Sequence, residues 1–216
     1  MPDCVLEYRI LTRKGKIIMI AIIDYGAGNL HSVKNALDFL GAESVITSVN
    51  ETILNDDHVI LPGVGSFGDA MECIKNSGLF ETVKQAADGT RPFLGVCLGL
   101  HLLFEESEES PGATGLGVFR GKVVKIPDCG LKIPHMGWNN LKTAKPSRIL
   151  PDTGEFMYFV HSYYIEPTDS EIVSSYTEYG KELAVSIENG NVFAVQFHPE
   201  KSGEAGLSIL KKFISL

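Results

Sequence analysis

Basic residues, long apolar runs and a secretion signal are scarce or missing in this sequence. The chain of 216 residues has 19 Lys and Arg against 27 Asp and Glu, which gives a formal net charge of −8. This acidic balance argues against a nucleic-acid-binding protein, because such proteins need a basic face to neutralise phosphates. No apolar run approaches the roughly 18 residues that span a bilayer, and the N-terminal segment MPDCVLEYRILTRKGK lacks the apolar core of a signal peptide. We therefore expect a cytoplasmic protein that binds neither nucleic acid nor membrane.

Clustered cysteines are also missing. The four cysteines are far apart and form no CxxC pair: Cys4, Cys73, Cys97 and Cys129. Free thiols are favoured over disulfides in a chain of this size without a secretion signal. A structural zinc site needs ligands closer together in sequence than these. We therefore expect no bound metal and no disulfide, and we assign no role to Cys4, Cys73 or Cys129.

Alternating strand and helix patterns are present in the first half of the chain. An apolar run at residues 17–24 predicts a strand. The next segment has apolar residues at spacings of three and four, which predicts a helix that ends near Gly41. A further strand and helix are predicted at residues 91–110, where RPFLGVC is typical of a strand and LGLHLLFEESEES of a helix. This alternation through residues 17–107 predicts βαβ units and a mainly parallel sheet.

The second half of the chain is richer in strands. Short apolar segments separated by turn residues predict several strands, and ENGN at residues 188–191 predicts a hairpin turn. Residues 203–216 predict a final helix. No internal repeat or low-complexity linker divides the chain, so we expect one domain over residues 19–216. Residues 1–18 precede the first strong strand, and we treat them as an N-terminal extension, with Met19 as an alternative start.

A cysteine stands between two glycines where a predicted strand meets a predicted helix, in the segment Gly95-Val96-Cys97-Leu98-Gly99. This is the layout of a nucleophile elbow, a tight turn in which side chains two residues before and after the nucleophile would clash. The thiol then lies at a helix N-terminus, where free N–H groups and the helix dipole favour the thiolate. The N–H of Leu98 would point at an oxyanion formed beside the sulfur. The alternative is a structural cysteine in a close-packed strand–helix turn.

A thiolate nucleophile needs a base that shuttles protons and a group that orients this base. Among the six histidines, His198 is best placed, because it follows an apolar strand and functional groups of open α/β sheets lie at such strand ends. Glu200 stands two residues later, so in an extended chain its carboxylate points the same way as the imidazole. Pro199 between them stiffens this geometry. We therefore predict a triad of Cys97, His198 and Glu200.

A second glycine loop follows another predicted strand, in the segment PGVGSFG at residues 62–68. It matches the GxGxxG pattern of dinucleotide-binding loops. That interpretation also needs an acidic residue on a second strand about 20 positions later, and none stands there. The same loop can instead supply a second backbone N–H to an oxyanion hole. We favour the oxyanion-hole interpretation and expect no cofactor.

Together these motifs resemble the Cys-His-Glu class I glutamine amidotransferases, and most closely their branch of glutaminase subunits of imidazole glycerol phosphate synthase. The resemblance rests on IIDYGAGNLHSV, LPGVGSFGDAM, GVCLGLHLLFEESEE, PHMGWN, YFVHSYY and VQFHPEKSG, which run in the family's order from about residue 19 to the C-terminus. The motifs GVCLG and FHPE are shared across the class, whereas PHMGWN, YFVHSYY and HPEKSG are specific to this branch. The resemblance implies a flavodoxin-like, three-layer α/β fold with a mostly parallel central sheet and a β-richer C-terminal half.

The resemblance also implies roles for single residues. Cys97 attacks the side-chain carboxamide of glutamine, and the backbone N–H groups of Val64 and Leu98 hold the oxyanion. His198 protonates the departing ammonia and then activates the water that releases glutamate, while Glu200 orients the imidazole. Further contacts to glutamine are implied for Gly65, Glu109, Ser162 and Tyr163.

The sequence departs from the family at His101, four residues after the nucleophile, where the family usually has a glutamine that contacts the substrate. One helical turn beyond the cysteine, His101 is predicted to face the same pocket. A neutral imidazole offers one donor and one acceptor, which suits it to replace the amide. We therefore keep His101 among the substrate-binding residues, and we regard His135 and His161 as pocket residues without a catalytic role.

The resemblance further implies a partner, a (β/α)8-barrel cyclase subunit in a heterodimer. The cyclase uses the ammonia to make imidazole glycerol phosphate and an aminoimidazole carboxamide ribotide. We expect residues 25–29 and 136–139 to face this partner or the ammonia exit, and Trp138 is either an interface anchor or a core aromatic. The main alternative function is a paralogous subunit that supplies ammonia to a surface-sugar synthase. A cysteine peptidase of similar fold, or a binding module without activity, agrees less well with a distant base and an intact triad.

Overall fold

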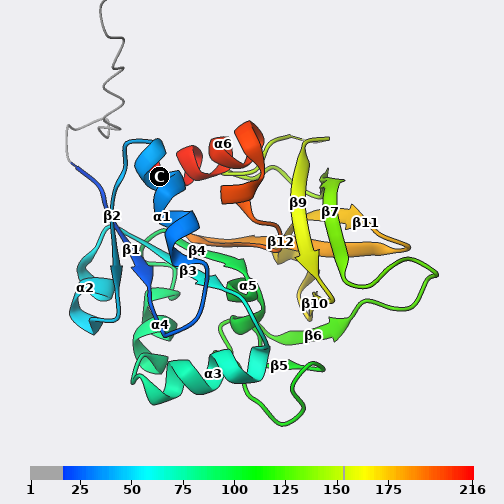
Figure 1. The fold of residues 1–216 in the computed structure, drawn as a ribbon, viewed down its shortest axis with the longest axis horizontal. Helices are drawn as coiled ribbons and strands as arrows, with labels where there is room; N and C mark the ends of the chain where they lie inside the picture. The colour runs from blue at the N-terminus through cyan, green and yellow to red at the C-terminus, as the bar shows by residue number, and fades with distance from the viewer. Residues whose placement is uncertain (1–16, 153) are drawn as a thin grey trace, which may run out of the picture.

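A computed structural model describes residues 17–152 and 154–216 (Figure 1). The extension predicted for residues 1–18 lies outside the described residues, apart from its last two positions. The described chain is an α/β fold in which helices cover both faces of a largely parallel sheet, and this sheet continues into antiparallel strands. In the part of the chain that the structure describes, no helix has the length and apolar character needed to cross a membrane.

The parallel part of the sheet is built from the apolar runs of the sequence. Its strands, in order across the sheet, are β2 (Glu43–Thr47), β1 (Met19–Ile23), β3 (His58–Gly63), β4 (Phe93–Cys97) and β13 (Val192–Val195). The strands β3, β4 and β13 are buried throughout, which explains why they are continuously apolar. Alternate residues of β1 serve the two faces: Ile20 and Ile22 belong to one core cluster, and Ala21 and Ile23 to the other.

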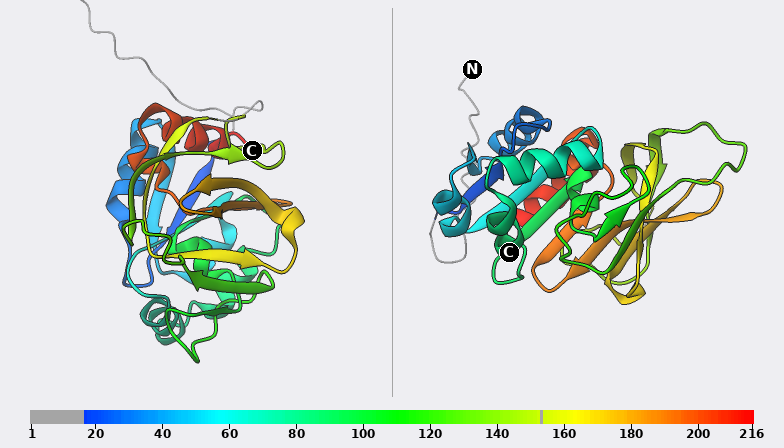
Figure 2. Two further views of the ribbon diagram at one scale, coloured as in Figure 1. Left: turned by 90° about the vertical axis from the view of Figure 1, so that its right-hand side faces the viewer. Right: turned by 90° about the horizontal axis from the view of Figure 1, so that it is seen from below.

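Helices cover both faces of the parallel strands (Figures 1 and 2). One face carries α1 (Leu30–Phe39) and α6 (Gly203–Ile214), whereas the other carries α2 (Asn50–Asn55), α3 (Phe67–Asn76), α4 (Phe80–Ala86) and α5 (Leu98–Leu102). Each of the longer helices turns a stripe of apolar residues toward the sheet, as Ile209, Leu210 and Phe213 do in α6. The resulting three layers enclose two cores, one on each face of the sheet.

The C-terminal half supplies antiparallel strands, which extend to one side of the helical layers (Figure 2). From β13 outward the order is β12 (Glu182–Asn189), β10 (Tyr163–Pro167) and β6 (Gly121–Lys125), with β11 (Val173–Glu178) on β12 and β8 (Lys142–Thr143) on β11. At the edge, β5 (Glu106–Ser107) from the first half of the chain pairs with β6 in parallel. A separate two-stranded sheet pairs β7 (His135–Asn140) with β9 (Phe156–His161), and two short 3-10 helices are η1 (Ser170–Ile172) and η2 (Pro199–Lys201). The antiparallel pairing of β12 with β13 confirms the predicted hairpin.

Two elements differ from the sequence prediction. Residues 50–55 form α2, although no helix is predicted there, and the helix predicted over residues 98–110 ends at Leu102. The chain returns at residues 116–119 and takes the free carbonyl groups at the end of α5: the Leu116 N–H donates to the Leu102 oxygen at 2.9 Å. Tertiary hydrogen bonds therefore override the helix propensity of EESEES, and the segment beyond α5 folds back toward α3.

Candidate active site

Cys97 occupies a strained turn between β4 and α5. It is the last residue of β4, with φ of 55° and ψ of −109°, and α5 begins at Leu98. Within residues 17–152 and 154–216, no other non-glycine residue has a positive φ. Such a conformation costs on the order of 1–3 kcal/mol and persists only where the surrounding structure holds it. The strain turns the thiol away from the path of the strand, as a nucleophile elbow requires.

The glycines around Cys97 have the steric role that the pattern predicts. A Cβ on Gly95 would lie 2.9 Å from the carbonyl oxygen of Gly99, and a Cβ on Gly99 would overlap the carbonyl oxygen of Leu61. The neighbouring strand approaches as closely, because a Cβ on Gly63 would lie 2.9 Å from the Cβ of Leu98. Only glycine allows β3, β4 and α5 to meet at this distance.

His198 reaches the thiol from a distant part of the sequence. It precedes η2, shortly after β13, and β13 pairs with β4 in parallel register. Its Nδ1 lies 2.8 Å from Glu200 Oε1, and Cys97 is close enough to raise the pKa of the ring. Burial by itself lowers the pKa of His198, but the hydrogen bonds and charges of Cys97 and Glu200 outweigh it and raise the pKa to about 9. The imidazole is therefore positively charged at neutral pH.

The backbone at Glu200 differs from the predicted extended geometry. His198 is extended, with φ of −100° and ψ of 97°, but residues 199–201 form the 3-10 helix η2. Proline fits the first position of a helical turn, so HPE closes a turn that brings the carboxylate back under the ring. Ser202 holds this turn: its hydroxyl donates to the His198 carbonyl at 2.6 Å and accepts from the Tyr158 N–H at 3.0 Å.

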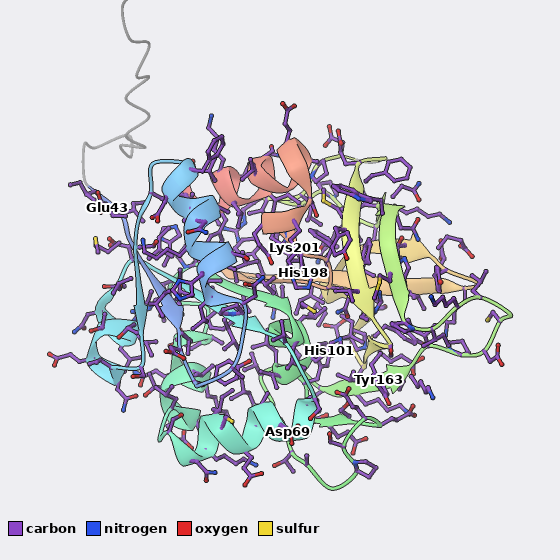
Figure 3. The ribbon with its side chains drawn as sticks, viewed as in Figure 1. Glu43, Asp69, His101, Tyr163, His198 and Lys201 are labelled. Atoms are coloured by element: carbon purple, nitrogen blue, oxygen red, sulfur yellow. The ribbon has the colours of Figure 1, made fainter. Side chains whose placement is uncertain are left out.

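A cavity of about 320 Å³ opens beside the thiol, a size typical of small-molecule sites. Cys97 and His198 line it, and so do the other residues predicted to contact substrate or oxyanion: Val64, Gly65, Leu98, His101, Glu109, Ser162 and Tyr163. These residues come from the loop after β3, from α5, from the segment at residues 103–119 that follows α5 and returns to it (the returning segment), and from the β9–β10 corner. Figure 3 shows how His198, His101 and Tyr163 approach the same central region from different elements.

Glu109 closes one side of this cavity at the start of α3. Its carboxylate accepts the Phe67 N–H at 2.8 Å, and the next residue, Ser110, accepts the Gly68 N–H at 2.9 Å. In a dinucleotide-binding loop, the pyrophosphate would need this helix N-terminus. Because a carboxylate already lies there, the geometry argues against the dinucleotide interpretation of PGVGSFG.

Three other histidines in or beside the cavity are buried and neutral: His101 and His161 line it, whereas His135, predicted as a pocket residue, contacts His161 and does not line the cavity. His101 Nε2 lies 2.6 Å from Gln196 Oε1, and burial lowers the pKa of His101 to about 4 in spite of this hydrogen bond. His161 Nδ1 donates to the Tyr163 carbonyl at 2.8 Å, and its Nε2 accepts from Nδ1 of His135 at 2.9 Å. Burial lowers the pKa of His161 to about 3 and that of His135 to about 4. Each is therefore a neutral hydrogen-bonding group at pH 7.

The sequence prediction missed Gln196. This side chain is completely buried and contacts His101 through Oε1, while its Nε2 lies 3.9 Å from Cys97 Sγ. A polar residue inside the apolar segment VFAVQF, two positions before His198, is the signal that could have identified it. Its partners lie so far away in sequence that spacing alone could not.

The segments predicted to face a partner are only partly at the surface. Strand β7 turns Met136 and Trp138 outward, with 62% and 56% of their surfaces exposed, so Trp138 is not a core aromatic. Tyr25, in contrast, is 3% exposed, and its hydroxyl would lie 2.7 Å from a Cβ on Gly63. Tyr25 therefore packs beneath the glycine loop and is unavailable to a partner.

Comparisons with known proteins agree with this geometry. Residues 21–216 match the family described as glutamine amidotransferase class-I. The chain is 49% identical over 199 residues to the imidazole glycerol phosphate synthase subunit HisH of Methanothermobacter thermautotrophicus, which covers 92% of this chain and 98% of the relative. It is 50% identical over 198 residues to the subunit of the same name from Bacillus cereus, with coverage of 90% and 93%. The solved structure of PurLQS from Thermotoga maritima shares the fold, with a TM-score of 0.74 at 18% identity over 92% of this chain and 98% of that one.

Proposed function

The chain belongs to the class I glutamine amidotransferases and, within them, to the family of the imidazole glycerol phosphate synthase subunit HisH, and on this premise we propose how it works. It hydrolyses glutamine through a thioester on Cys97 and passes the ammonia to a (β/α)8-barrel cyclase. The observation that carries this proposal is the buried contact series of Cys97, His198 and Glu200 beside a cavity of about 320 Å³.

In the first half-reaction, Cys97 Sγ attacks the carboxamide carbon of glutamine. A C–S bond forms, and the electrons of the C=O double bond move to the oxygen, which the N–H groups of Val64 and Leu98 stabilise. His198 then donates its proton to the amide nitrogen. The C–N bond breaks, ammonia leaves, and a γ-glutamyl thioester remains on Cys97. The raised pKa of His198 supports this step, because the proton is already on the imidazole at neutral pH.

In the second half-reaction, neutral His198 takes a proton from water. The water oxygen attacks the thioester carbon, the C–S bond breaks, and glutamate leaves, so that thiolate and imidazolium are restored. Glu200 stays on Nδ1 throughout, which leaves Nε2 to face the sulfur and the water. The net reaction converts glutamine and water to glutamate and ammonia without a cofactor.

The cavity lining supports binding of a free amino acid. We assign the α-ammonium group of glutamine to the Glu109 carboxylate, which lines the cavity and keeps a second oxygen beyond the one held by Phe67. The backbone of Gly65, Ser162 and Tyr163 completes the site. His161 fixes the Tyr163 carbonyl at 2.8 Å, so the β9–β10 corner is held in place before substrate arrives.

The exposed face of β7 supports a docking site for the cyclase. Met136 and Trp138 project from it, and aromatic and methionine side chains are enriched at protein interfaces. Trp138 contacts the ring of Tyr158, with ring centroids 6.1 Å apart, and the Tyr158 backbone carbonyl accepts a hydrogen bond from the backbone N–H of His198 at 3.0 Å. A partner bound to Trp138 is therefore two contacts from the base, which suits a subunit that releases ammonia on demand.

The deciding experiment is ammonia release from glutamine, measured with and without a histidine-pathway barrel cyclase and its nucleotide ligand. We expect low activity of the chain alone, strong stimulation in the complex, and none for Cys97→Ser in either case. Cys73→Ser is the matched control, because it removes a free thiol of α3 that lies outside the triad. A thioester trapped from labelled glutamine on the wild-type protein, and absent from Cys97→Ser, would identify Cys97 as the site of the covalent intermediate.

The partner assignment is tested separately with Trp138→Ala. Truncating an exposed anchor should weaken cyclase binding by on the order of tenfold or more, while basal ammonia release stays unchanged. Stimulation by a surface-sugar synthase in place of the histidine-pathway cyclase would instead favour the paralogous function.

A further inference from the structure

Gln196 is a buried amide that the proposed mechanism does not use. It lies between β13 and His198, lines the cavity and has no exposed surface. Burying an amide is costly unless its donors and acceptor find partners. Its backbone N–H donates to the Val185 carbonyl at 2.8 Å, which fixes the chain, and its side chain extends toward α5 and the sulfur.

His101 fixes the orientation of this amide. Its Nε2 lies 2.6 Å from Gln196 Oε1. An oxygen at that position can only accept, so Nε2 of His101 carries the proton and donates. The carboxamide NH2 group of Gln196 is thereby directed to the other side, where the Gln196 Nε2 atom lies 3.9 Å from Cys97 Sγ. The residue at which the sequence departs from the family pattern is thus tied to the nucleophile through one buried side chain.

We propose that Gln196 is a catalytic residue that donates a hydrogen bond to the Cys97 thiolate, and that His101 is a positioning residue that acts through Gln196. This inference rests on the proposed glutaminase function for its chemical context. It assigns His101 a role other than direct contact with glutamine.

The chemistry of a neutral amide fits this task. A thiolate is stabilised by N–H donors, and an amide donor cannot lose its proton to the sulfur at physiological pH. His198 supplies the transferable proton, and Gln196 supplies a fixed one. The amide therefore favours the charged sulfur before attack and again when the thioester breaks down, without competing for the proton that must reach ammonia.

Other titratable groups lie around the sulfur and must be held constant. They come from several elements: His198 before η2, Tyr25 after β1, His161 in β9 and Glu109 on the returning segment. His161 is neutral at pH 7, and burial together with Cys73 and Cys97 raises the pKa of Tyr25 above its usual value, so that Tyr25 is neutral too. Among these four groups, only His198 carries a positive charge. Substitutions at positions 101 and 196 leave His198 itself in place.

The test is the rate of alkylation of Cys97 by iodoacetamide between pH 5 and 9, in the absence of glutamine and in a Cys4→Ser/Cys73→Ser/Cys129→Ser background, in which Cys97 is the one remaining cysteine. We expect Gln196→Met, which fills a similar volume without a donor, to slow alkylation at pH 7 by about tenfold. Gln196→Glu replaces the donor with a carboxylate and should slow it at least as much. His101→Leu frees the amide to turn, so we expect a smaller loss of about three- to fivefold.

The double variant His101→Leu/Gln196→Met identifies the route of the effect. If His101 acts through Gln196, the double variant alkylates as slowly as Gln196→Met alone. His101→Gln should restore the wild-type rate, because a glutamine at 101 can also donate to Gln196 Oε1. In glutamine turnover, Gln196→Met and His101→Leu should lower kcat and leave KM close to wild type.

Three results would overturn the inference. These are an unchanged alkylation profile for Gln196→Met and Gln196→Glu, additive losses in the double variant, or a raised KM with unchanged kcat for His101→Leu. The last would mean that His101 contacts glutamine directly. Since alkylation needs no glutamine, the inference survives or fails independently of glutaminase activity. Matched thermal unfolding midpoints of all variants exclude a loss caused by misfolding.

Discussion

The two sides of the cavity hold their histidines in opposite charge states. On one side, which we call the base wall, His198 lies between Cys97 and Glu200, and its pKa is raised to about 9. On the other side, His101 and His161 line the cavity and His135 contacts His161, and we call these three residues the neutral wall. Burial lowers the pKa of His101 and His135 to about 4 and that of His161 to about 3. All four imidazoles are buried, so burial alone does not decide their charge.

The partners of each ring make the difference. On the base wall, a thiol and a carboxylate favour the imidazolium strongly enough to outweigh desolvation. On the neutral wall, the donors run in one direction: Asn139 donates to His135, His135 to His161, and His161 to the Tyr163 carbonyl. This series of hydrogen bonds needs an unprotonated acceptor nitrogen on each ring, so a second proton on either His135 or His161 would break the series. In the proposed mechanism the base wall moves a proton, whereas the hydrogen bonds of the neutral wall hold the Tyr163 carbonyl in place.

The largest effect is expected from removing the carboxylate of the base wall. Glu200→Gln should lower ammonia release between about 10²- and 10⁴-fold, because the imidazolium loses its partner and its tautomer is no longer fixed. The measurement is kcat for ammonia release at pH 7. Glu204→Gln, an exposed carboxylate in the first turn of α6, is the matched control and should retain wild-type activity. Retained activity in Glu200→Gln would remove Glu200 from the mechanism.

A smaller effect is expected when the base wall is deprotonated by pH alone. His198 must carry a proton to protonate ammonia, and its pKa is raised to about 9. The rate of ammonia release should therefore fall by about tenfold for each pH unit above 9. A rate profile recorded from pH 7 to 10.5 checks this, and a decline that begins near pH 6.5 would indicate an unperturbed imidazole.

The smallest effect is expected on stability, and it concerns the neutral wall. Since these pKa values are lowered in the folded protein, the unfolded chain binds protons first, and stability is lost as pH falls from about 6.5 toward 4. The free energy of unfolding, obtained from urea titrations at each pH, should fall less steeply with decreasing pH in His135→Gln/His161→Gln than in wild type. We expect the two slopes to differ by about 1–3 kcal/mol per pH unit. His31→Gln, at an exposed position of α1, should leave the slope unchanged. Equal slopes in wild type and double variant would show that these rings are not held neutral.

The base wall and the neutral wall also differ in how much the sequence foretold. The elbow is a local sequence pattern, because Gly95 and Gly99 stand two residues either side of Cys97, although the clash that Gly99 avoids is with Leu61 of the neighbouring strand. His198 and Glu200 follow from chemical need and a short motif, although η2 is a turn and not the extended segment predicted. These features are encoded within single segments, so their residue types are visible without a structure.

The neutral wall depends on contacts between distant segments, which the sequence does not display. Gln196 meets His101 only because β13 lies beside β4 and thus near α5. The helix after Cys97 stops at Leu102 for a similar reason, since residues 116–119 bond to its last carbonyl groups. Local propensity therefore predicts the strands and most helices, whereas the contact between His101 and Gln196 depends on the tertiary pairing of distant strands.

The charge of His198 is the claim on which the proposed mechanism depends, and NMR titration of this ring in labelled protein measures it directly. We expect the His198 imidazole to remain protonated until about pH 9, and to lose its proton at a lower pH in Cys97→Ala, where one of the two partners that raise its pKa is gone. A midpoint at or below 6.5 in the wild-type protein would contradict the account, because the base wall would then hold a neutral imidazole like those on the opposite side.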